Sequence, residues 1–356
     1  MSILVTGGTG GLGFHILSNL SGTNHDLYSF SDEQPQPWQK VDGVEYLTGD
    51  MLNFKDVLEM MQKVQPTHIY HLASQSSVGL SYKKPYETLN INLLGTQTLL
   101  EATRQIVPKA KIMLLSSSEI YGRTEQHLTY LHKETDLPNP LTPYATSKAC
   151  MEILGNQFRN ANDMHIVAVR PFHFTGPHHS RRFAIPSITY QLVKVKYYHS
   201  EPVIYSGSLD ISRDVVDVRD VARAMIQILN TAPSGQVYNI CSGKSYTFRE
   251  LVDMLVDIAG VSVDFRFDPA YERTNDIPLL IGDPTKVNEI GWKPMISIED
   301  SLTDLLTRWS CAAVPNSSSA WARTCRCRRP ASYSDITTSA PTEGRFLLLI
   351  FIFLRI

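Results

Sequence analysis

The sequence predicts an α/β fold built around a doubly wound parallel sheet, with a smaller α/β lobe in its C-terminal half. Two observations lead to this prediction. A short apolar strand that begins at Ile3 runs into a glycine-rich turn, and a helical pattern follows from Phe14. Further strands and helical stretches then alternate along the chain, which is the order that parallel sheets with helices on both faces require. The length of 356 residues is enough for two lobes of ordinary domain size.

The later elements follow the first helix in a regular order. Each expected strand is a short run rich in apolar and aromatic residues, and each expected helix is a longer stretch with helical periodicity. The expected strands cover residues 26–30, 46–50 and 69–74, the expected helices cover 53–64, 86–107 and 144–160, and a last amphipathic helix ends at Trp309.

The glycine-rich turn has the spacing of a dinucleotide-binding loop. Gly7 permits the tight turn, Gly10 lets the backbone approach a pyrophosphate, and Gly13 allows close packing of helix and strand. The helix N-terminus, with Gly11 and Leu12, supplies free N–H groups and the positive end of the helix dipole. An ordinary glycine-rich turn is the alternative, but the strand before it and the helix after it favour a Rossmann dinucleotide site.

A dinucleotide bound to this loop would extend along the carboxyl ends of the strands. Asp32, after the second strand, lies near the position at which a carboxylate accepts the adenosine ribose hydroxyls, which favours NAD(H) over NADP(H). Ser31 is an alternative strand-end residue, so the choice between NADH and NADPH stays open. Residues at the ends of the next strands complete the expected cofactor site: Asp50, Met51, Leu72, Ala73 and Ser74.

Tyr144 and Lys148 are the strongest candidates for chemistry. Four residues apart on a predicted helix, they share one face. A lysine ammonium beside a phenol favours the phenolate, so we expect it to lower the pKa of the tyrosine. A hydroxyl from the serine run at 116–118 would complete a proton relay suited to interconverting C–OH and C=O. The Tyr-x-x-x-Lys spacing is weak evidence alone, and it counts because a dinucleotide loop precedes it.

Motifs in both halves of the chain occur in the order typical of one enzyme family. The first half resembles the extended short-chain dehydrogenases/reductases, the NAD-dependent epimerase/dehydratase family, through TGGTGGLG, HLASQSSV, NLLGTQTLLEA, SSSEIYG and PYATSK. The second half is most similar to the GDP-4-keto-6-deoxy-D-mannose reductases, which form GDP-D-rhamnose, through segments 170–177, 207–220, 237–244 and 273–283. The resemblance covers roughly residues 1–310.

The resemblance implies roles for individual residues. Ser117 is the hydroxyl partner and Tyr144 the proton donor, while Lys148 sets the pKa of the tyrosine and binds the nicotinamide ribose. Glu119 stands where related 4,6-dehydratases keep an acid for β-elimination, and a solvated loop carboxylate explains it equally well.

The resemblance also implies a nucleotide-sugar site in the second lobe. Arg213 and Arg273 match arginines that hold this substrate, whose diphosphate suits a guanidinium fork. Where the family usually reads RPFNHTGP, this chain has His173 in place of the asparagine. We expect His173 at the substrate site as a neutral, packed side chain, with a new acid or base as the alternative. His178 and His179 follow without a cysteine or carboxylate at ligand spacing, so we expect them to face solvent and predict no metal site.

The activity that the resemblance implies is the NAD(P)H-dependent reduction of the C4 keto group of GDP-4-dehydro-6-deoxy-D-mannose to GDP-D-rhamnose. One alternative is a GDP-mannose 4,6-dehydratase, or another nucleotide-sugar epimerase or dehydratase, that keeps NAD tightly bound. Another is a non-catalytic NAD(P)-sensing protein, because a fold does not determine a function. The set of Ser117, Tyr144 and Lys148 argues against a sensor, which has no need of a proton relay.

Composition narrows the partners and the compartment. The formal net charge of −2 argues against a nucleic-acid partner and against binding to an anionic membrane. The first strand begins so early that we expect no signal peptide. The five cysteines lack the spacing of a disulfide framework, which favours the reducing cytoplasm. The resemblance also implies a homodimer that pairs through helices near 88–105 and 144–160.

The expected domain organisation follows the same family. Residues 1–170, with a return passage over 214–244, are expected to form the cofactor-binding Rossmann domain. Residues 171–213 and 245–310 are expected to form the nucleotide-sugar-binding lobe. The segment 311–356 contains Cys/Arg-rich and Ser/Thr/Pro-rich stretches and an apolar end, and we expect it to lie outside the enzyme fold.

Overall fold

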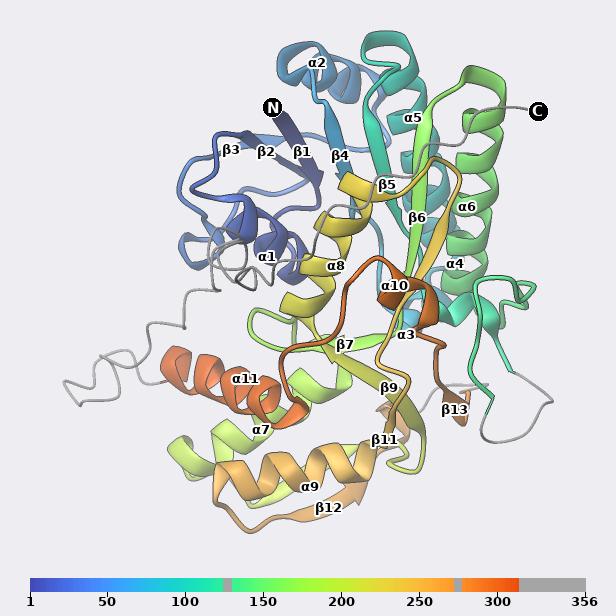
Figure 1. The fold of residues 1–356 in the computed structure, drawn as a ribbon. Coiled ribbons are helices and arrows are strands. Elements are labelled where there is room, and N and C mark those ends of the chain that lie inside the picture. The colour runs from blue at the N-terminus through green and yellow to red at the C-terminus, as the bar shows by residue number, and fades with distance from the viewer. Residues whose placement is uncertain (124–129, 272–276, 314–356) are drawn as a thin grey trace, which may run out of the picture.

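The computed structural model describes residues 1–123, 130–271 and 277–313. These residues form a larger lobe around one sheet and a smaller lobe beyond the carboxyl ends of its strands (Figure 1). The predicted fold class is confirmed, since neighbouring strands of the large sheet are parallel and their order is β10-β6-β5-β4-β1-β2-β3. The strands are β1 (Ser2–Thr6), β2 (Asp26–Ser31), β3 (Val44–Thr48), β4 (His68–His71), β5 (Lys111–Leu115), β6 (His165–Pro171) and β10 (Val237–Ile240).

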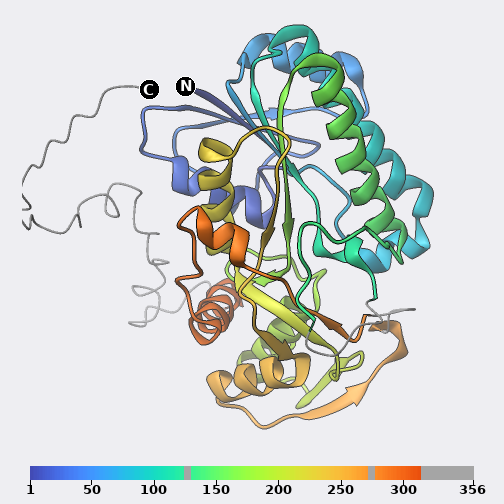
Figure 2. The ribbon, with the colours of Figure 1, turned by 45° about the vertical axis from the view of Figure 1, so that its right-hand side comes forward.

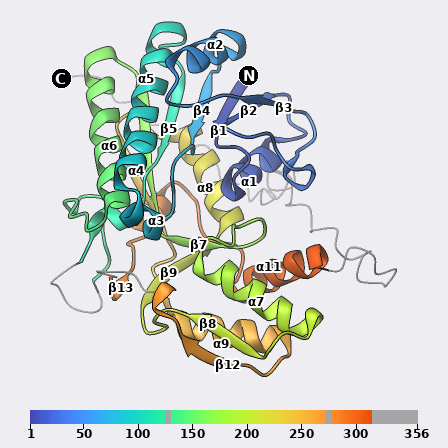
Figure 3. The same cartoon turned by 180° about the vertical axis from the view of Figure 1, so that it is seen from behind.

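Helices cover both faces of the large sheet because its strands are apolar on both sides. Alternate residues of β1 join two different buried clusters, with Ile3 and Val5 on one face and Leu4 on the other. Helices α1 (Gly11–Leu20) and α8 (Val218–Thr231) pack on the first face. The opposite face, seen in Figure 3, carries α2 (Phe54–Val64), α5 (Gly95–Ile106) and α6 (Pro143–Asn162).

The helix expected over 86–107 is assembled from consecutive pieces. After the short α3 (Val78–Lys83), the chain forms α4 (Pro85–Leu89), a π-helical turn (Asn90–Leu94) and α5. The side chain of Asn92, in the π turn, accepts a hydrogen bond from the N–H of Gln75 at 2.7 Å and donates one to the Ser147 hydroxyl at 2.8 Å. Asn92 thus ties the loop after β4 to α6, the helix that carries the Tyr-x-x-x-Lys motif.

The smaller lobe combines two small sheets with three helices, and Figure 2 shows it below the large sheet. The three helices share one buried apolar cluster: α7 (Ala184–Tyr198), α9 (Phe248–Ala259) and α11 (Ile298–Ala313). One sheet joins β7 (His173–Thr175), β9 (Ser212–Asp217), β11 (Ser245–Thr247) and β13 (Leu279–Leu280), and the other pairs β8 (Val203–Ser206) with β12 (Asp264–Phe267).

Short elements connect these layers. They are α10 (Thr285–Glu289) and the 3₁₀ turns η1 (Pro37–Gln39), η3 (Ser118–Tyr121) and η4 (Pro269–Tyr271). The chain returns from the small lobe to the large sheet through α8 and β10. Within the described part of the chain, no helix has both the length and the apolar character of a membrane span. Of the expected tail, residues from 314 onward lie outside the described residues.

Candidate active site

A cavity of about 610 Å³ lies at the carboxyl ends of the large sheet and is lined by both lobes. Parallel α/β sheets bind ligands at this edge because the loops that follow the strands converge there. The cavity extends from the glycine-rich loop, past the ends of β4 and β5, to β7 and the start of α7. Most of the predicted site residues line it: Gly7, Gly10, Gly11, Leu12, Gly13, Asp32, Asp50, Met51, Leu72, Ala73, Ser74, Ser117, Glu119, Tyr144 and His173.

The glycine-rich loop leaves no room for side chains. Gly7 has a φ of +71°, and a Cβ added there would lie 2.9 Å from the backbone nitrogen of Ala73. A Cβ on Gly13 would lie 2.6 Å from the Gly7 carbonyl oxygen, which is closer than Cβ atoms approach other atoms in proteins. At its glycines the loop therefore exposes backbone without side chains at the N-terminus of α1. This arrangement fits the pyrophosphate of a dinucleotide, which backbone N–H groups and the helix dipole can bind.

The end of β2 separates the two candidate ribose ligands. Ser31 is the last residue of the strand, is buried, and accepts a hydrogen bond from the Thr9 hydroxyl at 3.2 Å. Asp32 is the first residue beyond the strand, is exposed, and lines the cavity. Of the two, Asp32 offers a carboxylate toward the cavity while the Ser31 hydroxyl is engaged by the loop.

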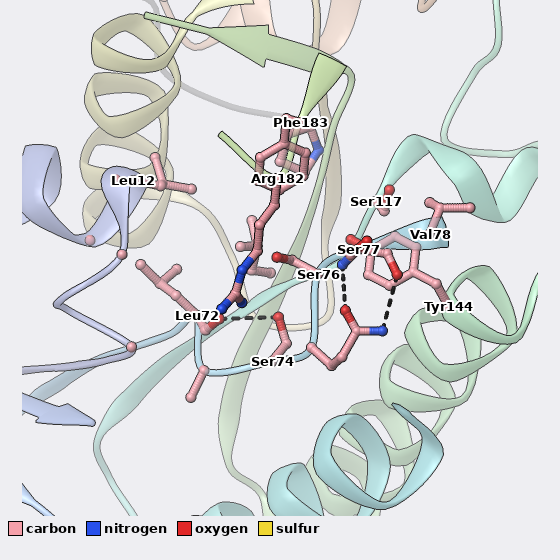
Figure 4. A pocket seen from close by; sticks show the side chains of 18 of the residues that line it. Leu12, Leu72, Ser74, Ser76, Ser77, Val78, Ser117, Tyr144, Arg182 and Phe183 are labelled. Atoms are coloured by element: carbon pink, nitrogen blue, oxygen red, sulfur yellow. Dashed lines mark hydrogen bonds between the residues drawn. The ribbon is translucent and has the colours of Figure 1, made fainter. Parts of the chain in front are cut away.

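Ser117, Glu119 and Tyr144 form the polar centre of the cavity. Ser117 lies close enough to Tyr144 to influence the pKa of the phenol, and Figure 4 shows both side chains at one end of the pocket. Ser117 also caps the η3 turn, since its Oγ accepts from the N–H of Glu119 at 3.2 Å. Glu119 is buried on this turn, so a carboxylate solvated in a loop is the wrong description of it.

The expected lowering of the tyrosine pKa is not what the structure gives. Burial raises the pKa of Tyr144 to about 12, the Ser117 side chain opposes this rise, and the charge of Glu119 adds to it. Lys148 is itself fully buried, and burial lowers its pKa to about 7. Its Nζ lies 5.8 Å from the centre of the Tyr144 ring and donates to the Leu115 carbonyl at 2.8 Å. Desolvation therefore outweighs the ammonium effect, and Lys148 lies behind Tyr144 rather than among the lining residues.

His173 lies in the substrate half of the cavity, at the start of β7. It is partly buried, and its ring meets Phe248 of α9 edge to face with 6.0 Å between ring centres. This contact joins β7 to α9 at the wall of the cavity, as a packed side chain would.

Arg213 lies elsewhere than the resemblance implied. Its side chain is 1% exposed inside the small lobe and is absent from the cavity lining. Nη1 donates to the carbonyl oxygens of Ile277 at 2.6 Å and Ser212 at 2.9 Å. The expectation that Arg213 binds the nucleotide-sugar is corrected here, because its guanidinium holds β9 against the segment at Ile277 instead. Arg273 lies outside the described residues.

The expectation that His178 and His179 face solvent is also wrong. His178 stacks on Phe14 of α1 with 3.9 Å between ring centres, and His179 stacks near Phe183 at 4.3 Å. Burial lowers the pKa of His178 to about 3 and that of His179 to about 4, so both rings are neutral at pH 7. Aromatic neighbours far away in sequence, such as Phe14, bury this loop, and no local pattern shows them.

Sequence reasoning missed Arg182, which lines the cavity. Figure 4 shows its side chain extending from the loop before α7 into the pocket, toward Leu72 and Ser74. No other arginine or lysine occurs among the described residues of the lining. The available signal was the pair Arg181-Arg182, which follows three residues after the segment that departs from the family.

Comparisons with known proteins agree with this architecture. A family model described as GDP-mannose 4,6 dehydratase matches residues 4–305. The GDP-6-deoxy-D-mannose reductase of Pseudomonas aeruginosa is 35% identical over 245 residues, which cover 68% of this chain and 80% of that protein.

Two solved structures extend the similarity to the fold. RMD from Pseudomonas aeruginosa, complexed with NADPH, has a TM-score of 0.75 at 29% identity and covers 87% of this chain and 99% of its own. The UDP-glucose 4-epimerase of Thermus thermophilus, complexed with NAD, has a TM-score of 0.79 at 26% identity, with the same coverage of both chains. Both similarities extend over nearly the whole of the solved chains.

Proposed function

The chain belongs to the GDP-mannose 4,6-dehydratase family, and on that premise we propose that it is an NAD(P)H-dependent reductase of a nucleotide-activated 4-keto-6-deoxyhexose. The preferred substrate is GDP-4-dehydro-6-deoxy-D-mannose, and the product is GDP-D-rhamnose. One observation carries the proposal. Ser117 and Tyr144 line a single cavity between the glycine-rich loop and the small lobe. The reductase relative at 35% identity supports the substrate.

The residues present fit a nicotinamide dinucleotide. Gly7, Gly10 and Gly13 would leave room for its pyrophosphate, and Asp32 would accept hydrogen bonds from the adenosine ribose. The bound cofactor would supply a hydride for the sugar C4 and would be oxidised to NAD(P)⁺ in the reaction.

Tyr144 holds the proton that the reduction needs. With a pKa of about 12 it is a neutral phenol at pH 7, so it can donate its proton to the C4 oxygen as negative charge develops there. Ser117 lines the cavity beside Tyr144, and its hydroxyl would stabilise the same oxygen. The balance is complete: the carbon gains a hydride, the oxygen gains a proton, and a keto group becomes an alcohol. Lys148, behind the phenol, would restore the proton.

A dehydratase is the second candidate, and Glu119 is the observation that favours it. This buried carboxylate lines the cavity close enough to Tyr144 to raise the pKa of the phenol. A 4,6-dehydratase needs such an acid for elimination, but it also needs a tyrosine that begins as a base. The relatives favour the reductase, since the GDP-6-deoxy-D-mannose reductase is 35% identical and the GDP-mannose 4,6-dehydratase of Yersinia enterocolitica is 26% identical.

The test is turnover by the full-length chain with enzymatically prepared GDP-4-dehydro-6-deoxy-D-mannose and either NADH or NADPH. Loss of the reduced cofactor's absorbance, with a 6-deoxyhexose product identified by NMR, is the expected result. Conversion of GDP-mannose to the keto sugar without added reductant would instead support the dehydratase. Dinucleotide binding without turnover of any nucleotide-sugar would support a sensor.

We also propose a homodimer that pairs through α5 and α6. Ile153 on α6 is 68% exposed and Leu94, just before α5, is 50% exposed, which suits a surface that a second copy covers. Leu99 and Leu100 are fully buried and belong to the core. By light scattering, the native chain should be a dimer and Ile153→Asp a monomer, while Leu137→Asp, at an exposed site outside these helices, should stay dimeric. A monomeric native chain would contradict this proposal.

The cytoplasmic location of the protein stays a prediction.

A further inference from the structure

The loop 176–183, which precedes α7, packs against the glycine-rich loop. A Cβ added to Gly11 would lie 2.6 Å from the carbonyl oxygen of His178, so the two backbones are in direct contact. Nε2 of His15, on α1, hydrogen-bonds the Pro177 carbonyl at 2.9 Å, and Phe14 stacks on His178. This loop is therefore held against the first turn of α1, where the pyrophosphate of a dinucleotide would bind.

Arg182 belongs to the same loop, four residues after His178, and its side chain lines the cavity. Its side chain extends toward Leu72 and Ser74, at the carboxyl end of β4 (Figure 4). Arg182 is an exposed residue with no ion pair to the other residues that the structure describes, and its backbone N–H donates to the Ser180 hydroxyl at 3.3 Å. A guanidinium placed in a cavity without a carboxylate partner is available to an anionic ligand.

The charges of the other residues that line the cavity also bear on the role of Arg182. Four carboxylates face the cavity among the described residues, and Arg182 is the guanidinium set against them. A diphosphate would bring further negative charge into this site, and the glycine loop offers neutral N–H groups. The planar fork of an arginine binds a diphosphate through two parallel hydrogen bonds. The carboxylates are Asp32, Asp50, Glu87 and Glu119.

We propose that Arg182 is a diphosphate-binding residue of this cavity. Its guanidinium binds the diphosphate of the dinucleotide from the small-lobe side, opposite the glycine-rich loop. The inference rests on the proposed function for the identity of the ligands. The nucleotide-sugar also carries a diphosphate, so the same chemistry has two sources. The contact of the loop with Gly11 favours the cofactor.

The experiment compares Arg182→Ala with Arg181→Ala in the full-length chain. Arg181 is the matched control, because its guanidinium lies 4.5 Å from the centre of the Tyr190 ring and it does not line the cavity. Binding of NADH, followed by fluorescence titration, requires no turnover and so remains informative if the proposed reaction is wrong. We expect Arg182→Ala to weaken NADH binding by about 10- to 100-fold, the usual effect of losing hydrogen bonds to a charged group. Arg181→Ala should bind NADH as the native chain does.

Two further readouts separate ligand binding from a structural role. The loss in Arg182→Ala should shrink at high salt, because ions screen a partly exposed charge, whereas a misfolded loop would not respond in this way. Arg182→Lys should recover part of the affinity, since it restores the charge without the fork. A raised KM for the nucleotide-sugar with unchanged NADH affinity would keep the diphosphate role and assign it to the substrate. Unchanged affinity for both ligands would overturn the proposal.

Discussion

The two halves of the cavity are built in different ways. The cofactor half is defined by backbone: Gly7 contacts the backbone of Ala73, and Gly13 contacts the backbone of Gly7. The substrate half is defined by side chains that come from separate elements, such as Ser117 with Tyr144 and His173 with Phe248. Close backbone contacts leave no space for an added atom, but they supply neither a charged group nor a transferable proton. Side-chain contacts carry the charge and the proton, and they depend on packing from distant segments.

The comparison predicts different failures for the two halves. A change in the cofactor half should act on affinity for the dinucleotide, since the loop only binds. A change in the substrate half should act on turnover, on substrate affinity or on pH response, since its side chains carry protons and charge. The following variants test this separation, beginning with the largest expected effect.

Replacement of the phenol should abolish most turnover without loss of cofactor binding. In Tyr144→Phe we expect kcat to fall by about 10²- to 10⁴-fold, because the proton donor is removed, while the Kd for NADH stays unchanged. Tyr130→Phe is the control: it loses a hydroxyl bonded to Asp136 at 2.9 Å outside the cavity and should keep its kcat. Steady-state kinetics and NADH titration measure both effects. A Tyr144→Phe enzyme that retains native turnover would remove the tyrosine from the mechanism.

A methyl group added in the glycine-rich loop should have the opposite effect, a loss of cofactor affinity. In Gly13→Ala the new Cβ would lie 2.6 Å from the Gly7 carbonyl oxygen, so the loop must move. We expect NADH affinity to fall by about 100-fold, which corresponds to about 3 kcal/mol of binding free energy. Gly79→Ala on α3 meets no atom closer than the Ser77 Oγ at 4.0 Å, and it should bind NADH normally. Equal affinities in the two variants would contradict a pyrophosphate site at this loop.

Acid should weaken the contact between the lobes. Burial lowers the pKa of His15 to about 4, that of His178 to about 3 and that of His179 to about 4. The unfolded chain, with histidines near pKa 6.5, binds these protons first, so the stability is complete above about pH 6.5 and is lost as the pH falls toward the folded values. One such histidine accounts for about 2 kcal/mol between about pH 7 and about pH 5.

His179→Phe tests this linkage with little change in packing. The phenyl ring can stack against Phe174 and Phe183 as the imidazole does, but it cannot take up a proton. Chemical denaturation at the two pH values should show a smaller loss of unfolding free energy in the variant than in the native chain. Identical pH dependence would mean that His179 keeps its ordinary pKa.

The smallest effect is expected where the chain departs from its family. His173→Asn restores the usual residue at a position where the imidazole packs against Phe248. If His173 is a neutral, packed residue, kcat should change by less than about 3-fold and KM for the nucleotide-sugar by less than about 10-fold. The pH profile of kcat should stay the same. A shifted profile with a large fall in kcat would show that His173 acts as an acid or base.

Local segments explain why so much could be predicted from the sequence. The strand, the glycine spacing and the helix that begins at Gly11 are set within a dozen residues, so their backbone geometry follows from residue type. The four-residue spacing of Tyr144 and Lys148 likewise follows from the helical repeat of α6. The family motifs then indicated which hydroxyl accompanies the tyrosine.

Tertiary packing decided the properties that depend on surroundings. The sequence does not distinguish Arg213, buried against backbone carbonyls, from Arg182, which lies in the cavity. It predicted a lowered pKa for Tyr144, yet burial of the phenol raises that pKa, while burial of Lys148 lowers the pKa of the lysine. The physical reason is that desolvation depends on every segment packed around a group, whereas a motif contains only its neighbours along the chain. The sequence by itself determined the fold, the glycine loop and the identity of the candidate relay. The tertiary structure decided which charged side chains face the cavity and how burial shifts the pKa values of its titratable groups.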